Sequence, residues 1–338
     1  MKGWKIVNPS EIKEQEILEL EENSGLSKVK ITKALITLGD VLRYTGDIES
    51  KDLVLGGTGI GIVSDTDANL FGLEKGKHVY IEPYKNCEEC FECKSGQPSD
   101  CSNLLYAGED FDGFLRDFIS VDASKLFVLP DSVQDLDALF IEQISLALSV
   151  VDKLNIQAGD YVSIIGANNF ANILAQLIIY YQAVPIVVTN NDEDYKIAKD
   201  SGIYYVLGSE DNWAKEVATI TSGRMTKSVV YVSDCNVSTT KAFALAAHGA
   251  SIAFTGVSYK NSAIPFAQAI KKQLIIHCIS SGIGNTAASI NLLANKAINL
   301  SHLKLDSAPY SSVAEVFKNM SKTLEKEDKI YETIIDLV

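Results

Sequence analysis

Residues 86–101 read NCEECFECKSGQPSDC, and this stretch points most directly to the fold. It holds four of the six cysteines, spaced C-x2-C-x2-C-x7-C. Two-residue gaps let a tight turn bring neighbouring sulfurs to one ion, and four thiolates are a typical ligand set of structural zinc. The candidate metal ligands are Cys87, Cys90, Cys93 and Cys101.

The residues between these cysteines are mainly Glu, Lys, Ser and Asp, which cannot form an apolar core. Some iron–sulfur proteins share the short gaps, so an iron–sulfur cluster is the rival interpretation. A single isolated four-cysteine lobe within a β-rich segment favours zinc. Such a site has no open coordination position, so we expect it to stabilise the lobe rather than to do chemistry.

Length and charge limit the remaining possibilities. A chain of 338 residues predicts about two domains, and 46% hydrophobic residues are enough for a large core. The formal charge is 30 − 44 = −14, which argues against nucleic-acid and membrane partners. The first fifteen residues contain no apolar h-region, and the apolar stretch 170–189 contains two glutamines, an asparagine and a proline. We therefore expect a protein of the reducing cytoplasm.

The hydrophobic pattern divides the chain into two parts. Residues 1 to about 140 contain short β-branched runs separated by Gly, Asp and Asn, with little helical periodicity. From about residue 142 strands of about five residues alternate with helices of ten or more, which predicts βαβ units and a doubly wound parallel sheet. The predicted strands here are 161–165, 184–189, 204–207, 228–232, 251–255 and 274–279.

The turn after the first of these strands is where a dinucleotide-binding G-x-G-x-x-G motif would lie. It reads GANNFA, so the first glycine, Gly166, is present, whereas Asn168 and Ala171 occupy the other two positions. An asparagine side chain at the second position obstructs a pyrophosphate. At the end of the next strand Asn190 replaces the acid that would hold a ribose 2′-hydroxyl. The candidate cofactor-binding residues are Gly166, Asn168, Asn169 and Asn190; binding is expected to be weakened, with NAD and NADP both open.

Two other glycine-rich stretches resemble phosphate loops. Residues 56–61 (GGTGIG) lie in the β-rich part, where we expect a bend between strands. Residues 282–287 (GIGNTA) follow the last clear strand, and we expect a loop that lines the active cleft.

The cysteine lobe, the β-rich part before it and the βαβ part after it resemble the zinc-containing medium-chain dehydrogenases, which include alcohol, polyol and threonine dehydrogenases. Further matching stretches are FDGF at 111–114 and QAGD at 157–160. The resemblance implies a GroES-like catalytic domain over 1–141 with the zinc lobe at 85–103, and a Rossmann domain over 142–285. It also implies that 286–338 complete the catalytic domain, and that the protein is a homodimer or homotetramer acting on a small molecule.

The resemblance further implies a second, catalytic zinc, but its ligand positions are altered here. Thr37 stands where the family has a cysteine, and Gly56–Gly57–Thr58 replaces the Gly-His-Glu segment. Residues 1–77 contain no Cys and no His, so Asp40 and Glu142 alone are too few ligands. We therefore expect one structural zinc and no catalytic zinc, with Thr37, Asp40 and Glu142 as candidate catalytic residues. Tyr44 is a further candidate proton donor.

Three hypotheses follow. The first is an NAD(P)-dependent oxidoreductase of this family with altered, zinc-free chemistry. The second is a non-catalytic binding or assembly partner that keeps the fold and the structural zinc. The third is an enzyme that does non-redox work in the same cleft.

Overall fold

The computed structural model of the chain describes residues 1–17, 26–66, 72–232, 237–256, 263–326 and 328–337. Contacts divide the chain into two units. Unit 1 comprises Met1–Glu142, Thr286–Ala294 and Leu305–Val338, and unit 2 comprises Gln143–Asn285 and Asn295–Lys304.

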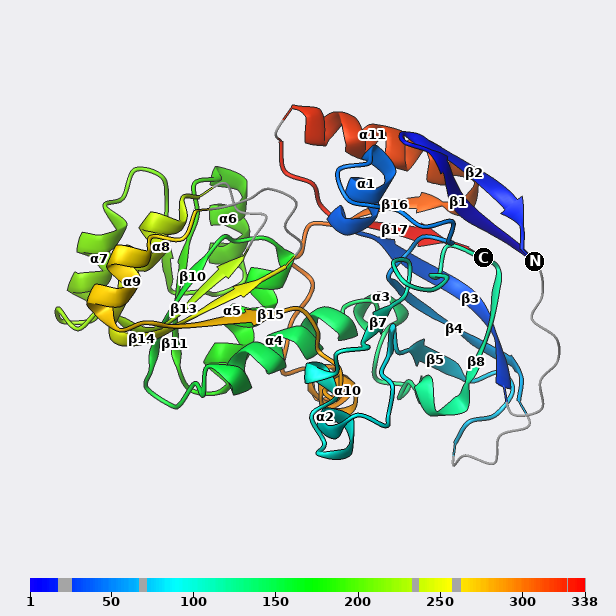
Figure 1. The fold of residues 1–338 in the computed structure, drawn as a ribbon, viewed down its shortest axis with the longest axis horizontal. Helices are drawn as coiled ribbons and strands as arrows, with labels where there is room; N and C mark the ends of the chain where they lie inside the picture. Colours follow the sequence, from blue (N-terminus) through cyan, green and yellow to red (C-terminus); the bar gives the residue numbers. More distant parts are fainter. Residues whose placement is uncertain (18–25, 67–71, 233–236, 257–262, 327, 338) are drawn as a thin grey trace. The chain divides into compact units, whose positions relative to one another are not determined.

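Unit 2 is built on a six-stranded parallel sheet with the order β12-β11-β10-β13-β14-β15 (Figure 1). Strand β10 (Tyr161–Ile165) reads YVSII and has four of its five residues buried, as expected where helices cover both faces. The order reverses at β10, which is the switch point at which dinucleotides bind in folds of this topology. The other strands are β11 (Val184–Val188), β12 (Tyr205–Leu207), β13 (Thr226–Val232), β14 (Ala246–Thr255) and β15 (Ile275–Ile279).

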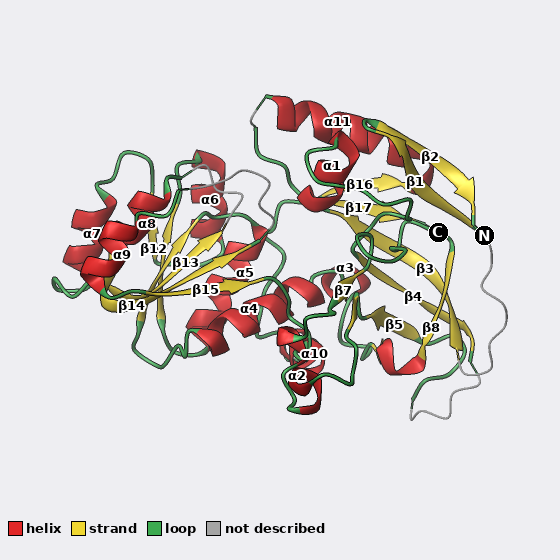
Figure 2. Cartoon of the chain, viewed as in Figure 1, coloured by secondary structure: helices red, strands yellow, loops and turns green. Residues whose placement is uncertain are grey.

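Helices flank this sheet (Figure 2). Trp213 and Phe243 pack with Ile and Val side chains of the strands in one core. Lys272 is the last residue of the helix Phe266–Lys272. Its Nζ donates to three carbonyls at the C-terminal end of the helix Thr239–Leu245, those of Phe243, Ala244 and Ala246, at 2.9, 3.2 and 2.6 Å. The helices are α4 (Ile141–Lys153), α5 (Asn169–Tyr180), α6 (Asp192–Asp200), α7 (Trp213–Ile220), α8 (Thr239–Leu245) and α9 (Phe266–Lys272).

Unit 1 contains a seven-stranded sheet in which β3 (Leu26–Ile36) pairs antiparallel with β4, β8 and β17. The sheet order is β16-β17-β3-β4-β5-β9, with β8 beside β3. Its other strands are β4 (Thr58–Asp65), β5 (His78–Ile81), β8 (Phe118–Asp122), β9 (Leu126–Val128), β16 (Asp306–Pro309) and β17 (Thr333–Asp336). Two smaller sheets pair β1 (Lys2–Asn8) with β2 (Glu11–Glu16), and β6 (Tyr84–Lys85) with β7 (Leu105–Tyr106).

Segments from far along the chain complete unit 1. Strand β17 pairs with β3, and α11 (Val313–Glu325) lies against α1 (Leu38–Thr45), as Figure 1 shows. The rings of Tyr44 and Phe317 meet at 5.2 Å between centroids. Helix α11 buries one face and leaves the other exposed, whereas α1 has no exposed residue, so the two helices cover each other's apolar side chains. The shorter helices of unit 1 are α2 (Phe91–Lys94), α3 (Asp135–Ala138) and α10 (Thr286–Ala294).

The predicted fold class, a β-rich unit with a doubly wound parallel-sheet unit, is confirmed. Helix α1 in the β-rich part and helix α9 in unit 2 were not predicted. The expected bend at 56–61 needs correction too. Strand β4 begins at Thr58, so only Gly56 and Gly57 precede it, and Gly56 has a φ of 93°. A Cβ at Gly59 would lie 2.6 Å from Phe114, so close packing requires that glycine.

Candidate functional site

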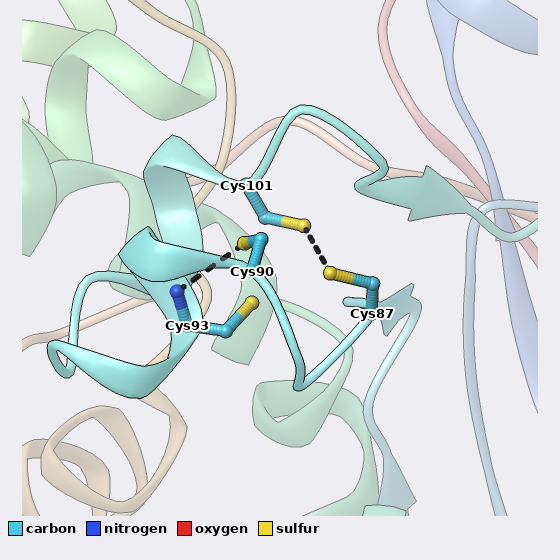
Figure 3. Close-up of side chains that lie close together, drawn as sticks. All are labelled: Cys87, Cys90, Cys93 and Cys101. Carbon is cyan, nitrogen blue, oxygen red and sulfur yellow. Dashed lines mark hydrogen bonds between the residues drawn. The ribbon is translucent and has the colours of Figure 1, made fainter.

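The four lobe cysteines come together in unit 1. Their sulfurs all lie within 4.8 Å of one another, and Cys87 and Cys101 are 3.6 Å apart (Figure 3). Cys90 caps α2, where its sulfur accepts the amide of Cys93 at 3.4 Å. Cys101 follows the short 3-10 turn Pro98–Asp100.

This arrangement fits a zinc ion. Four sulfurs at zinc–sulfur distances lie about 3.8 Å from one another, close to the observed grouping. Hydrogen bonds favour the thiolate of Cys87, since the amides of Glu89 and Cys90 lower its pKa to about 6, whereas the pKa of Cys90 is raised. The side chain of Asn86 lowers the pKa of Cys93 in the same way.

The candidate catalytic residues Thr37 and Asp40 form a helix cap. Thr37 is the N-cap of α1, and its amide and hydroxyl donate to Asp40 Oδ2 at 2.9 and 3.0 Å. Asp40 Oδ1 accepts the amide of Gly56 at 3.0 Å, and Asp40 is only 3% exposed. The carboxylate therefore accepts from three donors, and its bond from the Thr37 amide is one half of the reciprocal capping box of a helix start, in which the Thr37 side chain accepts the Asp40 amide.

Tyr44 lies one turn further along α1. Its hydroxyl donates to the carbonyl of Ser10 at 2.7 Å, and burial raises its pKa. This contact contradicts the hypothesis that Tyr44 serves as a proton donor to a substrate.

Glu142 occupies the first turn of α4 and has a different environment. The hydroxyl of Tyr84 donates to its Oε1 at 2.6 Å. The residue keeps part of its surface exposed, yet desolvation by the protein around it raises its pKa, and the bond from Tyr84 opposes that rise. Buried Tyr80 lies within the field of Glu142 and Glu82, and its own pKa is raised by burial first and by these carboxylates second.

The altered ligand positions do not make a second metal site. Among the described residues, the four lobe cysteines form the single group of three or more His, Cys, Asp or Glu side chains close enough to share an ion. Asp40 is occupied by three donors, and the residues at 56–58 supply no ligand side chain of that kind. The described residues therefore do not fit a catalytic zinc.

The turn between β10 and α5 shows what Asn168 does. Gly166 has a φ of 104°, which favours glycine, and Asn168 is the N-cap of α5. Its side-chain oxygen accepts the amide of Ala171 at 2.9 Å. The carboxamide thus occupies one of the amides that a helix N-terminus otherwise offers to a phosphate.

Asn169 and Asn190 differ in exposure. Asn169 is 2% exposed and exchanges two hydrogen bonds with the backbone of Lys304, at 2.9 and 3.2 Å. Its side chain therefore holds the 295–304 segment of unit 2 in place. Asn190 is exposed directly after β11, at the position that faces a ribose in folds of this topology.

The glycine-rich stretch at 282–287 has a packing role. A Cβ on Gly282 would lie 2.3 Å from backbone atoms of Ser145 and Leu146. Asn285 Nδ2 also donates to Ser149 Oγ at 3.0 Å. The glycine is needed for close approach to α4.

Sequence reasoning missed the polar residues that surround these sites. Tyr84, Asn86 and Lys125 carry no motif, and their partners are 58, 7 and 43 residues away. The one signal in the sequence that could have indicated these residues is that each is a charged or polar residue next to the end of an apolar strand.

The two units together define the alcohol-dehydrogenase class of fold. Residues 23–131 match the family model of the alcohol dehydrogenase GroES-like domain. The chain is 25% identical to an uncharacterized zinc-type alcohol dehydrogenase-like protein of Haemophilus influenzae, over 95% of each chain. It is 22% identical to sorbitol dehydrogenase of Bacillus subtilis, over 90% of this chain and 89% of that one.

Solved structures agree on the fold. The alcohol dehydrogenase rspB of Escherichia coli CFT073, solved with NADH, superimposes with a TM-score of 0.86 over 100% of this chain and 99% of that one, at 22% identity. The family model over residues 23–131, the zinc-type alcohol dehydrogenase-like relative and the shared fold together support a medium-chain dehydrogenase/reductase. Within the described residues, no helix combines the length and the apolar character needed to cross a membrane.

Proposed function

We propose that the protein is a cytoplasmic NAD(P)-linked oxidoreductase of the alcohol and polyol dehydrogenase type, with one structural zinc and no catalytic zinc. The observation that carries this proposal is the capping box of Thr37 and Asp40. At the place where the family implies metal ligands, this chain has side chains that satisfy one another and the backbone. The substrate is a small molecule whose identity the residues do not define.

The zinc would be held by Cys87, Cys90, Cys93 and Cys101, and four thiolates leave it no position for substrate. Its contribution is to fold the lobe. Because the residues between the ligands are mainly polar and no residue of α2, Phe91 included, is buried, the lobe has no apolar core of its own.

A dinucleotide would be held at the switch point of unit 2. The glycine turn at Gly166 and the start of α5 fit a pyrophosphate, and exposed Asn190 fits a ribose hydroxyl as a neutral hydrogen-bonding partner. When bound, the nicotinamide supplies or accepts the hydride. Asn168 lowers the affinity because its carboxamide competes for the amide of Ala171.

Glu142 is the residue that we propose to hold the catalytic proton. Desolvation raises its pKa toward the range useful for general acid–base work, and Tyr84 fixes its orientation through Oε1. Oε2 then carries the proton that compensates the charge developing on the substrate oxygen during hydride transfer. This proton replaces part of the stabilisation that a metal would give.

The cap at Asn168 favours two other candidate functions, neither of which involves redox chemistry. One is a non-catalytic binding partner, and the other is an enzyme that does non-redox work. NADH and NADPH titrations by calorimetry separate the candidates. Saturable binding of NADH or NADPH supports the oxidoreductase. If neither NADH nor NADPH binds at millimolar concentration, the oxidoreductase proposal is refuted, and the binding partner and the non-redox enzyme remain.

Metal analysis tests the zinc assignment separately. We expect one zinc per chain in the purified protein. Two zinc ions per chain would refute the absence of a catalytic zinc.

The protein is further proposed to be a homo-oligomer that joins through the β15 edge of unit 2. Ile275 on this edge strand and Phe266 and Ile270 on α9 are 54%, 66% and 76% exposed, which is high for large apolar residues. Light scattering should show a dimer or tetramer, and Ile270→Glu should shift it toward the monomer. A monomeric wild type would refute this.

A further inference from the structure

A chain of polar contacts runs from a lobe cysteine to the core of unit 1. Asn86 Nδ2 donates to Cys93 Sγ at 3.4 Å, and Asn86 Oδ1 accepts from Lys125 Nζ at 3.3 Å. Lys125 Nζ also contacts Glu82 Oε2 at 3.3 Å. Glu82 Oε1 accepts the hydroxyl of Thr286, the first residue of α10, at 2.9 Å.

The carboxamide of Asn86 has a defined orientation. If it were flipped, its oxygen would face the thiolate and its NH₂ group would face the ammonium, and both contacts would be repulsive. The side chains of Lys125 and Glu82 are only 16% and 8% exposed, so water screens this arrangement poorly.

The negative charge of the lobe explains why a lysine would be linked to it through Asn86. One zinc with four thiolates carries a net charge of −2, and the lobe adds four carboxylates between residues 88 and 100 against one lysine, Lys94. A cation that reaches the thiolates through a hydrogen bond relieves this repulsion. Lys125 is placed to do so because it is the last residue of the 3-10 turn Ala123–Lys125 and its carbonyl accepts the amide of Glu82 at 2.9 Å.

We propose that Asn86 and Lys125 are positioning residues for the structural zinc. They hold Cys93 as a thiolate ligand, and Glu82 and Thr286 fasten the pair to α10. This inference rests on the zinc assignment of the proposed function. It assigns a metal-retaining role to residues outside the ligand set, of the kind that changes metal affinity by about 10–100-fold in other sites.

Zinc release to a chromophoric chelator tests the proposal. Asn86→Ala and Lys125→Met should each release zinc about tenfold faster than the wild type. Lys94→Met is the matched control, since it removes the same charge from an exposed position in the lobe, and it should release zinc at the wild-type rate. Equal acceleration in Lys94→Met and Lys125→Met would show a general charge effect and overturn the proposal.

The double variant tests whether Lys125 acts through Asn86. Asn86→Ala with Lys125→Met should release zinc no faster than Asn86→Ala alone, because the two changes break one path. Additive acceleration would overturn this path. Lys125→Arg keeps the cation and should restore slow release, and circular dichroism identifies any variant that fails to fold.

The outcomes separate this inference from the zinc assignment. One zinc per chain with wild-type release rates in Asn86→Ala and Lys125→Met would overturn the inference alone. If the wild-type protein contains no zinc after expression in zinc-containing medium, both the inference and the zinc assignment are overturned.

Discussion

The cysteine lobe and the start of α1 satisfy their polar side chains in opposite ways. In the lobe, four sulfurs converge within 4.8 Å of one another, close enough to share one metal ion. At α1, Asp40 accepts three hydrogen bonds from its own neighbourhood and needs no ion. The difference shows that polar side chains at a helix start can be satisfied entirely by the chain, whereas the converging sulfurs of the lobe can share an ion.

Breaking the lobe should have the largest effect. Cys87→Ser removes one of four ligands, and we expect loss of zinc and a fall in Tm of about 10 °C, because the lobe has no apolar core to fall back on. Differential scanning calorimetry with metal analysis measures both. Retention of zinc and of the wild-type Tm would show that the lobe is not a structural zinc site.

Breaking the cap should cost stability without costing metal. Asp40→Ala leaves the amides of Thr37 and Gly56 without their acceptor, and we expect about 2–3 kcal/mol of lost unfolding free energy. Denaturant unfolding gives the energy, and zinc content should stay at one per chain. A loss of zinc from two per chain to one would instead make Asp40 a metal ligand.

Glu142 adds a third case to the comparison of the cysteine lobe with the start of α1, since it is neither a helix-capping residue nor one of the lobe cysteines. Its folded pKa is raised from 4.5, so the folded state binds its proton more tightly than the unfolded state does. Its contribution to stability is therefore lost as pH rises from about 4.5 through the folded pKa. Glu142→Gln should be more stable than the wild type at pH 8, and this advantage should disappear near pH 4. The same difference at both pH values would contradict the raised pKa.

The second self-satisfied cap, at Asn168, should give the smallest effect. Asn168→Gly frees the amide of Ala171, and glycine is itself an acceptable N-cap, so we expect only a few tenths of a kcal/mol of destabilisation. NADH should bind about fivefold more tightly, the gain of one charge-assisted hydrogen bond to the pyrophosphate. Unchanged affinity in calorimetry would mean that Asn168 does not compete with the cofactor.

The sequence predicts the parallel-sheet unit well because its signals are local. Strand β10 has its predicted bounds, since the mainly apolar run YVSII lies between Asp160 and Gly166. Helix α1 was missed because its eight residues are too short for a clear periodicity and are stabilised by α11, which lies more than 260 residues further along.

The candidate site divides in the same way. The lobe follows from spacing alone, because its ligands lie within fifteen residues. The contact of Glu142 with Tyr84, and that of Lys125 with Asn86, join residues 58 and 39 apart and depend on how strands are placed. No spacing rule encodes such contacts, so they appear only in the folded chain.

The pairing of β17 with β3 has a consequence for how the protein is made. All six strands of the parallel sheet of unit 2 lie within residues 161–279, so this sheet can form while the ribosome is still adding later residues. Strand β3 must wait for residues 333–336 before its β17 edge is covered. During synthesis the nascent chain therefore carries an open β-edge for about 300 residues, and this edge is where a chaperone would be needed most.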